Sequence, residues 1–217
     1  MTQLDLPLPR PPRERDEHFL IGTSNARTLH AIDHWATWPV MAALLVGPRK
    51  SGRSLLGRLF VARTGGTLAD DADRMGETEL FHAWNRAQAD RRPLLIVADA
   101  APPEWQVRLP DLRSRLAASQ VLRLGPPDDA LAVDLFAYLF DRRELDARPD
   151  LIAWLVKRVE RSHLAVIRVV DRLEEDADAR RSRRLSIPTA RAALLSAGLL
   201  TERASGSTAA PEALDQP

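Results

Sequence analysis

Cysteine is absent from this chain of 217 residues, which excludes disulfides and cysteine-ligated metal sites. A large excess of charge of either sign is absent too: the formal net charge is +1, so charge alone gives no argument for binding a polyanion. No apolar run approaches the roughly 18 residues that a membrane-spanning helix needs. Residues 1–8 lack the basic start and long apolar stretch of a signal peptide. These absences predict a cytoplasmic protein without a membrane segment.

Histidines are few, and their spacing gives no metal site. His30 and His34 stand one helical turn apart, but no recognised spacing places a third ligand with them. We expect surface or capping roles for the histidines and core packing for the five tryptophans.

Apolar runs of strand length alternate with helical patterns in the first part of the chain. Such runs cover residues 41–46, 94–98 and 121–124, with a shorter one at 67–69. From residue 128 onward only amphipathic helical patterns follow. The alternation predicts the α/β class, with a parallel sheet flanked by helices, and the change of pattern predicts a separate all-α domain.

Changes in composition divide the chain into four expected segments. Residues 1–17 form a short peptide and a Pro-rich, charged linker, and residues 18–127 form the α/β base. Residues 128–199 form a helical domain. Residues 200–217, rich in Ala, Ser, Gly and Pro, are expected to be a disordered tail.

A glycine-bracketed loop lies between a strand pattern and a helix pattern at residues 47–54. In such a loop, backbone N–H groups and the positive end of the helix point at a bound phosphate. The spacing matches the P-loop pattern at every defining position but one, where Arg53 replaces lysine. A guanidinium can contact phosphate, but its larger planar geometry weakens the catalytic arrangement, and Lys50 could compensate. The candidate nucleotide-binding residues of the loop are Gly47, Pro48, Lys50, Ser51, Gly52, Arg53 and Ser54.

Carboxylates follow two of the strand patterns. Asp70 and Asp71 come after the short run at residues 67–69, and Asp99 ends the run at residues 94–98. Polar residues at the carboxyl ends of strands lie beside the ligand in α/β sheets, and an NTPase holds its magnesium ion with such an acid. Without that context, the adjacent aspartates fit a solvated turn.

An apolar peptide at residues 3–8 precedes the linker. It combines a glutamine with three leucines, and the Pro-rich stretch behind it keeps it from joining the core easily. This pattern predicts a tethered docking peptide; the alternative is an irregular terminus with incidental leucines. The residues that would contact the partner are Gln3, Leu4, Leu6 and Leu8.

In their order along the chain, these segments resemble the Hda-type family of DnaA-related AAA+ regulators and, more distantly, the ATPase module of the initiator DnaA. The resemblance covers residues 3–198. Its most specific part is Leu-Pro-Asp-Leu-Arg-Ser-Arg-Leu at residues 109–116, similar to the segment that carries an arginine finger. The other similar segments are the clamp-binding motif at 3–8, the segment near the adenine pocket at 19–25, Walker A at 47–54, Walker B at 68–71, sensor 1 at Asp99, the sensor 2 helix at 161–173 and the last lid helix from 185–188.

The resemblance implies a AAA+ P-loop fold with an all-α lid and a negative regulator of replication initiation. The peptide would bind the DNA-loaded sliding clamp, the beta subunit of DNA polymerase III, so the protein would reach DNA and the nucleoid through the clamp. Arg115 would act in trans on ATP bound to DnaA; a helix-surface salt bridge is its alternative role. The protein's own pocket would hold ADP, or ATP, with magnesium at Ser54 and Asp70. Self-association stays open.

Three features depart from the family pattern. Only about fifteen residues separate Walker A from the acidic pair, where the family has a further helix and edge strand, so we expect four parallel strands. The second departure is Arg53. The third is Leu164 at the sensor 2 position, which leaves Arg161 and Arg168, on the same helix face, as candidates for that role.

Two other functions remain open at this level. In a self-standing P-loop NTPase, Asp70 or Asp71 would hold magnesium and Asp99 would position the attacking water, although Arg53 argues against it. In a nucleic-acid adaptor, the arginines within residues 180–184 would contact DNA, although such a run is usually a solvated surface.

Overall fold

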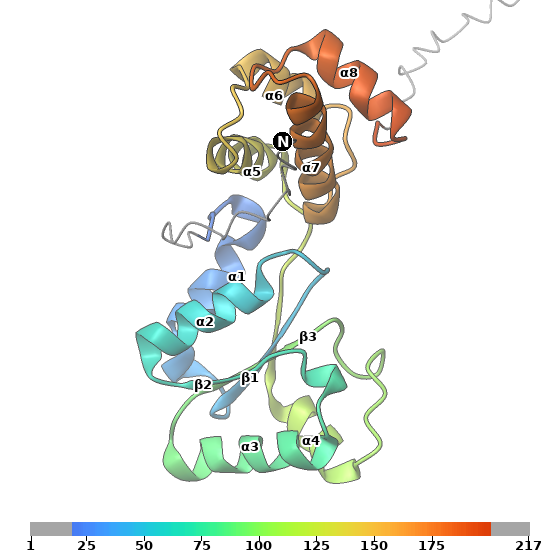
Figure 1. Ribbon diagram of the computed structural model, residues 1–217. Helices are drawn as coiled ribbons and strands as arrows, with labels where there is room; N and C mark the ends of the chain where they lie inside the picture. The colour runs from blue at the N-terminus through green and yellow to red at the C-terminus, as the bar shows by residue number, and fades with distance from the viewer. Residues whose placement is uncertain (1–18, 201–217) are drawn as a thin grey trace, which may run out of the picture.

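The structure is a computed structural model that describes residues 19–200. The predicted docking peptide at residues 3–8, the linker behind it and the predicted tail beyond residue 200 lie outside the described residues. The described part forms two lobes, a sheet with helices on both faces and a purely helical lobe (Figure 1). No helix between residues 19 and 200 is both long enough and apolar enough to cross a bilayer.

Four parallel strands form the sheet, in the order β2-β3-β1-β4. Their bounds are Ala42–Val46 for β1, Thr67–Ala69 for β2, Leu94–Ala98 for β3 and Gln120–Arg123 for β4. The central strands β1 and β3 are buried along their whole length, which explains their continuous apolar sequences. The expected α/β class and the expected sheet of four parallel strands are both confirmed.

Two helices cover each face of this sheet (Figure 1). On one face lie α1 (Thr23–Asp33) and α2 (Arg53–Thr64). On the other lie α3 (Glu77–Asp90) and α4 (Pro110–Ala118). Two short 3₁₀ helices complete the lobe, at Trp35–Thr37 and Ala72–Arg74.

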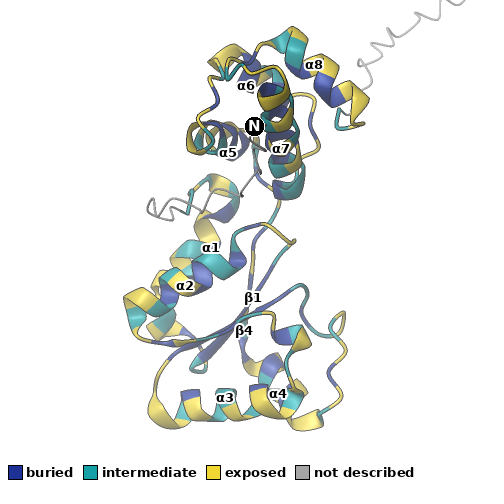
Figure 2. Cartoon of the chain, in the orientation of Figure 1, coloured by how far each residue is buried: buried dark blue, intermediate teal, exposed yellow. Residues whose placement is uncertain are grey.

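Side chains of the central strands alternate between two apolar cores, and buried residues line the sheet in Figure 2. Leu44 and Ile96 belong to the core that also contains residues of α3 and α4. Their neighbours Leu45 and Val97 belong to the core that contains Phe60 of α2. Burying one such side chain stabilises the fold by roughly 1.5–3 kcal/mol. The loop between β1 and α2 is therefore anchored at both of its ends in packed structure.

The helical lobe contains α5 (Asp129–Arg142), α6 (Pro149–Val156), α7 (His163–Ala179) and α8 (Ile187–Ser196). These four helices share one apolar core, separate from the two cores of the sheet. Prolines open α6 and the first turn of α8, where the missing N–H costs no helical hydrogen bond. The buried members of this core include Phe136, Phe140, Leu151, Leu155 and Leu173.

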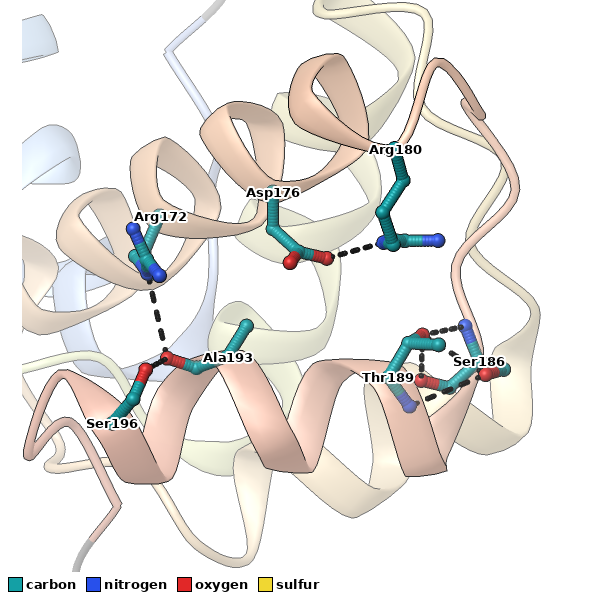
Figure 3. Close-up of polar contacts among 7 residues, drawn as sticks. All are labelled: Arg172, Asp176, Arg180, Ser186, Thr189, Ala193 and Ser196. Atoms are coloured by element: carbon teal, nitrogen blue, oxygen red, sulfur yellow. Dashed lines mark hydrogen bonds and ion pairs between the residues drawn. The ribbon is translucent and has the colours of Figure 1, made fainter.

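Polar contacts define the start of α8 and attach its far end to α7 (Figure 3). The Ser186 hydroxyl accepts from the Thr189 backbone N–H at 3.4 Å, and the Thr189 hydroxyl accepts from the Ser186 N–H at 3.1 Å. Near the other end, Arg172 Nε donates to the Ala193 carbonyl at 3.4 Å, and the Ser196 hydroxyl donates to the same oxygen at 2.8 Å. These bonds satisfy backbone groups that a helix leaves open at its ends.

Asp128 joins the two lobes by capping two helices at once. One carboxylate oxygen accepts from the Leu131 N–H at 2.8 Å in the first turn of α5. The other accepts from the Thr23 hydroxyl at 2.8 Å and the Ser24 N–H at 3.0 Å, in the first turn of α1. The Leu131 hydrogen bond, followed by those from Thr23 and Ser24, lowers the pKa of Asp128. One side chain thus links the start of the helical lobe to the first helix of the base.

We expect Asp128→Ala to lower the free energy of unfolding by about 1–2 kcal/mol, because both helix starts lose an acceptor. Since the folded pKa is depressed, the contribution is present above the ordinary aspartate pKa of about 4 and is lost as the pH falls through the folded value. Urea unfolding at pH 7 and at pH 3 measures both effects. Asp134→Ala, an exposed aspartate of α5, is the control and should stay within about 0.5 kcal/mol. Equal stability of both variants would contradict the prediction.

Candidate nucleotide site

The P-loop joins β1 to α2 and requires glycine at two positions. Gly52 has a φ of 86°, in the left-handed region, and a Cβ there would lie 2.9 Å from Cε2 of Phe19. A Cβ on Gly47 would lie 2.8 Å from the Leu124 carbonyl oxygen. Lys50 also has a positive φ of 67°, which is uncommon for a lysine and marks a constrained loop. The geometry thus explains both glycines of the motif.

The Arg53 side chain contacts the carboxyl end of the central strand β3. It is buried, at 7% exposure, and its guanidinium donates to the Ala98 carbonyl and to Oδ1 of Asp99, the latter at 2.5 Å. The Arg53 hydrogen bond lowers the pKa of Asp99 below its ordinary value, and the nearby charges of Arg49 and Arg74 act in the same direction, while burial opposes them. Arg53 and Asp99 therefore neutralise each other at the end of β3.

Ser54 and Asp70 meet as a P-loop magnesium site requires. The Ser54 hydroxyl donates to Oδ1 of Asp70 at 3.1 Å, and the Asp71 N–H donates to the same oxygen at 3.1 Å. Asp71 itself is exposed and has a φ of 49°, at the turn before the second 3₁₀ helix. Residues 19–200 contain no cluster of three or more His, Cys, Asp or Glu side chains arranged for a metal. The Ser54–Asp70 pair fits Mg²⁺, which typically takes only one or two protein ligands and completes its shell with water and phosphate oxygens.

A cavity lies where the P-loop meets the segment ahead of α1 and helices α5 and α7. It encloses about 610 Å³ of empty space, including its open mouth. Lys50 and Ser51 line the loop end, and no acidic side chain lines it. Apolar side chains dominate the remainder of the lining, among them Phe19, Leu55, Leu131, Leu135 and Ile167. A cationic end and a long apolar wall suit a ligand with an anionic group and a flat ring.

Polar side chains in the cavity differ in whether they have partners. Asn25 is satisfied, because its amide donates to the Leu20 carbonyl and accepts from the Gly22 N–H, both at 2.9 Å. Ser51 Oγ and His163 Nδ1 are buried and have no hydrogen-bond partner among residues 19–200. Burial lowers the pKa of His163, so the imidazole is neutral at pH 7. A ligand could therefore supply the missing partners of these two buried atoms.

Neither arginine expected at the sensor 2 position reaches this cavity. α7 begins at His163, so Arg161 precedes the helix and does not share a helical face with Leu164, contrary to the expectation. Arg161 pairs with Asp129 of α5 at 2.7 Å, and Arg168 is exposed. The residue that α7 places in the cavity is His163, for which the sequence suggested a surface or capping role. The sequence signal that could have identified His163 is its position directly before Leu164, the residue at the sensor 2 position.

Arg115 lies on α4 and packs against α3. Its guanidinium carbon stands 4.4 Å from the Phe81 ring centroid and 5.2 Å from that of Trp84, and its Nε donates to Asn85 Oδ1 at 2.9 Å. Arg115 is half-buried and forms no ion pair within the described part of the chain, so the alternative of a helix-surface salt bridge is wrong for these residues. The aromatic rings hold a cation without neutralising it.

Two of the four arginines in the basic cluster after α7 pair with acids of the same lobe. Arg180 Nε contacts Asp176 at 2.6 Å (Figure 3), and Arg183 contacts Asp178 at 2.7 Å. Arg184 meets Asp146 through the backbone, in an isolated β-bridge. Local pairing lowers the free positive charge that binding to a nucleic-acid backbone needs. The structure therefore gives the adaptor hypothesis no additional support.

The described part of the chain thus has a four-stranded parallel sheet that carries the P-loop, followed by a lobe of four helices. No protein-family model matches the sequence. The chain is similar to domain III of the Thermotoga maritima replication initiation protein DnaA, with a TM-score of 0.66 and 14% identity over 82% of this chain and 94% of that one.

Two further solved structures show the same similarity. Thermotoga maritima RuvB, a Holliday-junction branch migration motor, has a TM-score of 0.61 and 14% identity over 81% of this chain and 70% of that one. A replication initiator DnaA bound to AMPPCP and single-stranded DNA has a TM-score of 0.57 and 12% identity over 75% of this chain and 66% of that one. At these identities the similarity shows the fold alone, which this chain shares with the DnaA and RuvB structures.

Proposed function

We propose that this protein is a DnaA-related AAA+ regulator of replication initiation, acting on nucleotide held by a partner. The observation that carries the proposal is the Arg53–Asp99 pair at the end of β3. Hydrolysis in its own P-loop would need a cation free to contact phosphate and a polar group free to position water. The side chains at those two positions hold each other instead, so the chemistry is assigned to a partner's site.

Arg115 is the group assigned to that site. An arginine finger stabilises the charge that develops on the transferred phosphoryl group, and it must arrive with its charge uncompensated. The stacking of Arg115 on Phe81 and Trp84, with Nε held by Asn85, orders the side chain and leaves the charge available. The DnaA-like fold supports the choice of the ATP-bound initiator DnaA as the partner.

The N-terminal peptide is proposed to bring the protein to the DNA on which DnaA acts. It lies outside the described residues, and its proposed target is the DNA-loaded sliding clamp, contacted through Gln3, Leu4, Leu6 and Leu8. A tethered peptide raises the effective concentration of the AAA+ module beside DNA without adding contacts to the initiator. The protein would thus be cytoplasmic and associated with the nucleoid through the clamp.

The pocket at the P-loop is proposed to hold ADP or ATP as a structural ligand. Lys50 at the cavity's loop end and the first turn of α2 would face the phosphates, and Ser54 with Asp70 would hold magnesium. The similarity to a DnaA that binds AMPPCP supports this assignment. Arg53 ties the loop to the sheet, a role that does not depend on phosphate.

Reconstitution with ATP-bound DnaA, DNA-loaded clamp and this protein tests the proposal. We expect wild type to accelerate ATP hydrolysis. Changing Gln3, Leu6 and Leu8 together to alanine should lower stimulation by at least about tenfold at limiting protein, and excess protein should restore it, because tethering acts through concentration. Asp5→Ala in the same peptide is the control and should behave as wild type. Absence of stimulation by wild type would overturn the proposal.

A self-standing NTPase is the second candidate, and the Ser54–Asp70 contact favours it, because that pair could hold magnesium at the protein's own site. Steady-state hydrolysis by the isolated protein, abolished by Asp70→Ala, would establish this function in place of the first. The Arg53–Asp99 pair predicts that no such hydrolysis is observed.

A further inference from the structure

His163 lines the cavity but takes no part in the function proposed above. It is the first residue of α7, only 9% exposed, and the other cavity residues from this helix are Val166 and Ile167. Its Nδ1 is buried without a hydrogen-bond partner among residues 19–200. An imidazole in this apolar wall destabilises the free protein, because a buried polar atom without a partner loses its hydration and gains nothing.

Two parts of the cavity lining differ in what they can bind. Lys50 and the P-loop provide positive charge and N–H groups in one part. His163 lies on α7, and the lining around it includes Leu135 and Leu139 of α5. A neutral imidazole among aliphatic side chains does not attract phosphate, but it can donate or accept one hydrogen bond at the edge of a flat heteroaromatic ring. Rotation of the ring about Cβ–Cγ exchanges Nδ1 with a carbon of similar size, so the nitrogen can reach a ligand without repacking.

We propose that His163 is the specificity-determining residue of this pocket and hydrogen-bonds the base of a bound purine nucleoside diphosphate. The inference rests on the nucleotide-binding part of the proposed function and adds the residue that recognises the base. In this chain the polar contact from α7 comes from His163, whereas Leu164 at the expected position is half-buried and does not line the cavity. The phosphates would be bound by the P-loop, a different segment of the lining, so the two contacts can be tested separately.

Calorimetric titration with ADP, and separately with pyrophosphate, tests this division. His163→Leu should weaken ADP binding about tenfold, the usual range for losing one hydrogen bond, and leave pyrophosphate binding unchanged. His163→Asn places an amide near the position of Nδ1 and should return the ADP affinity to within about threefold of wild type. The melting temperature of ligand-free His163→Leu should equal or exceed that of wild type, because the variant removes an unpartnered buried polar atom.

Glu175→Ala is the matched control, since it changes an exposed residue of the same helix that does not line the cavity and should alter neither titration. Unchanged ADP affinity in His163→Leu would overturn the inference while leaving nucleotide binding intact. Parallel losses of ADP affinity, pyrophosphate affinity and melting temperature would show a purely structural role and overturn it as well. If wild type binds no ADP, the inference falls together with the nucleotide assignment. Stimulation of DnaA that depends on Arg115 would still stand in each of these cases.

Discussion

Arg115→Ala should reduce the stimulation of DnaA-bound ATP hydrolysis by about 10³-fold or more, the lower end of the range for removing an arginine finger. The loss should appear in the rate constant at saturating protein, because the interaction forms with charge that develops in the transition state. Arg115→Lys should remain strongly impaired, since an ammonium lacks the planar geometry that binds two phosphate oxygens together. The measurement is single-turnover hydrolysis of ATP on DnaA with DNA-loaded clamp present.

Arg113→Ala is the matched control for this prediction. Arg113 lies on the same helix, is exposed, and carries the same charge, so its loss should change the rate less than about threefold. Arg115→Ala also removes the contacts with Phe81 and Trp84, which contribute about 0.5–1 kcal/mol to stability. The melting curve separates that effect from the rate. Equal loss of stimulation in both variants would show a general charge effect and contradict a finger role.

The α/β base could be predicted from the sequence because its signals are local. The continuous apolar runs that form β1 and β3 are typical of strands buried on both faces, and both strands lie in the middle of the sheet. β2 is only Thr67–Ala69, too short to identify alone, and the acids that follow it indicate a strand only together with the family resemblance. The start of α7 was placed two residues early because Ser162, whose hydroxyl accepts from the Ala165 N–H, is the N-cap.

The candidate site was less predictable, because its contacts join segments that are distant in sequence. The motif spacing identifies Arg53 as a residue of the P-loop, but it does not show the direction in which the side chain points. That direction follows from the pairing of Val46 with Ala98, which places the end of β3 beside the P-loop. Likewise, no local pattern places Arg115 on the rings of α3, because that contact depends on how α3 and α4 pack. The partners of Arg53 and Arg115 therefore depend on strand order and helix packing, which the composition of the chain does not reveal.

Removing Asp99 and removing Arg53 should lower the free energy of unfolding by different amounts, although the two residues form one ion pair. Asp99→Ala leaves a guanidinium at 7% exposure without its carboxylate and should lower the free energy of unfolding by about 2–4 kcal/mol. Arg53→Met removes the buried charge and leaves Asp99, which is 37% exposed and therefore screened by solvent. That variant should cost only about 1–2 kcal/mol. Urea unfolding at pH 7 measures both.

The double variant should resemble Arg53→Met alone, because once the buried charge is gone Asp99 has little left to stabilise. Acid should weaken the same pair: the folded pKa of Asp99 is depressed, so its contribution is present above the ordinary aspartate value of about 4 and is lost as the pH falls through the folded pKa. Asp99→Ala should consequently show a flatter loss of stability between pH 5 and pH 2 than wild type. Arg74→Ala, whose guanidinium stands 3.8 Å from Asp99 and is exposed, should change stability by less than about 0.5 kcal/mol. Additive losses in the double variant would mean that the two side chains act independently, and the assignment of Arg53 to the sheet in place of the phosphate would then be wrong.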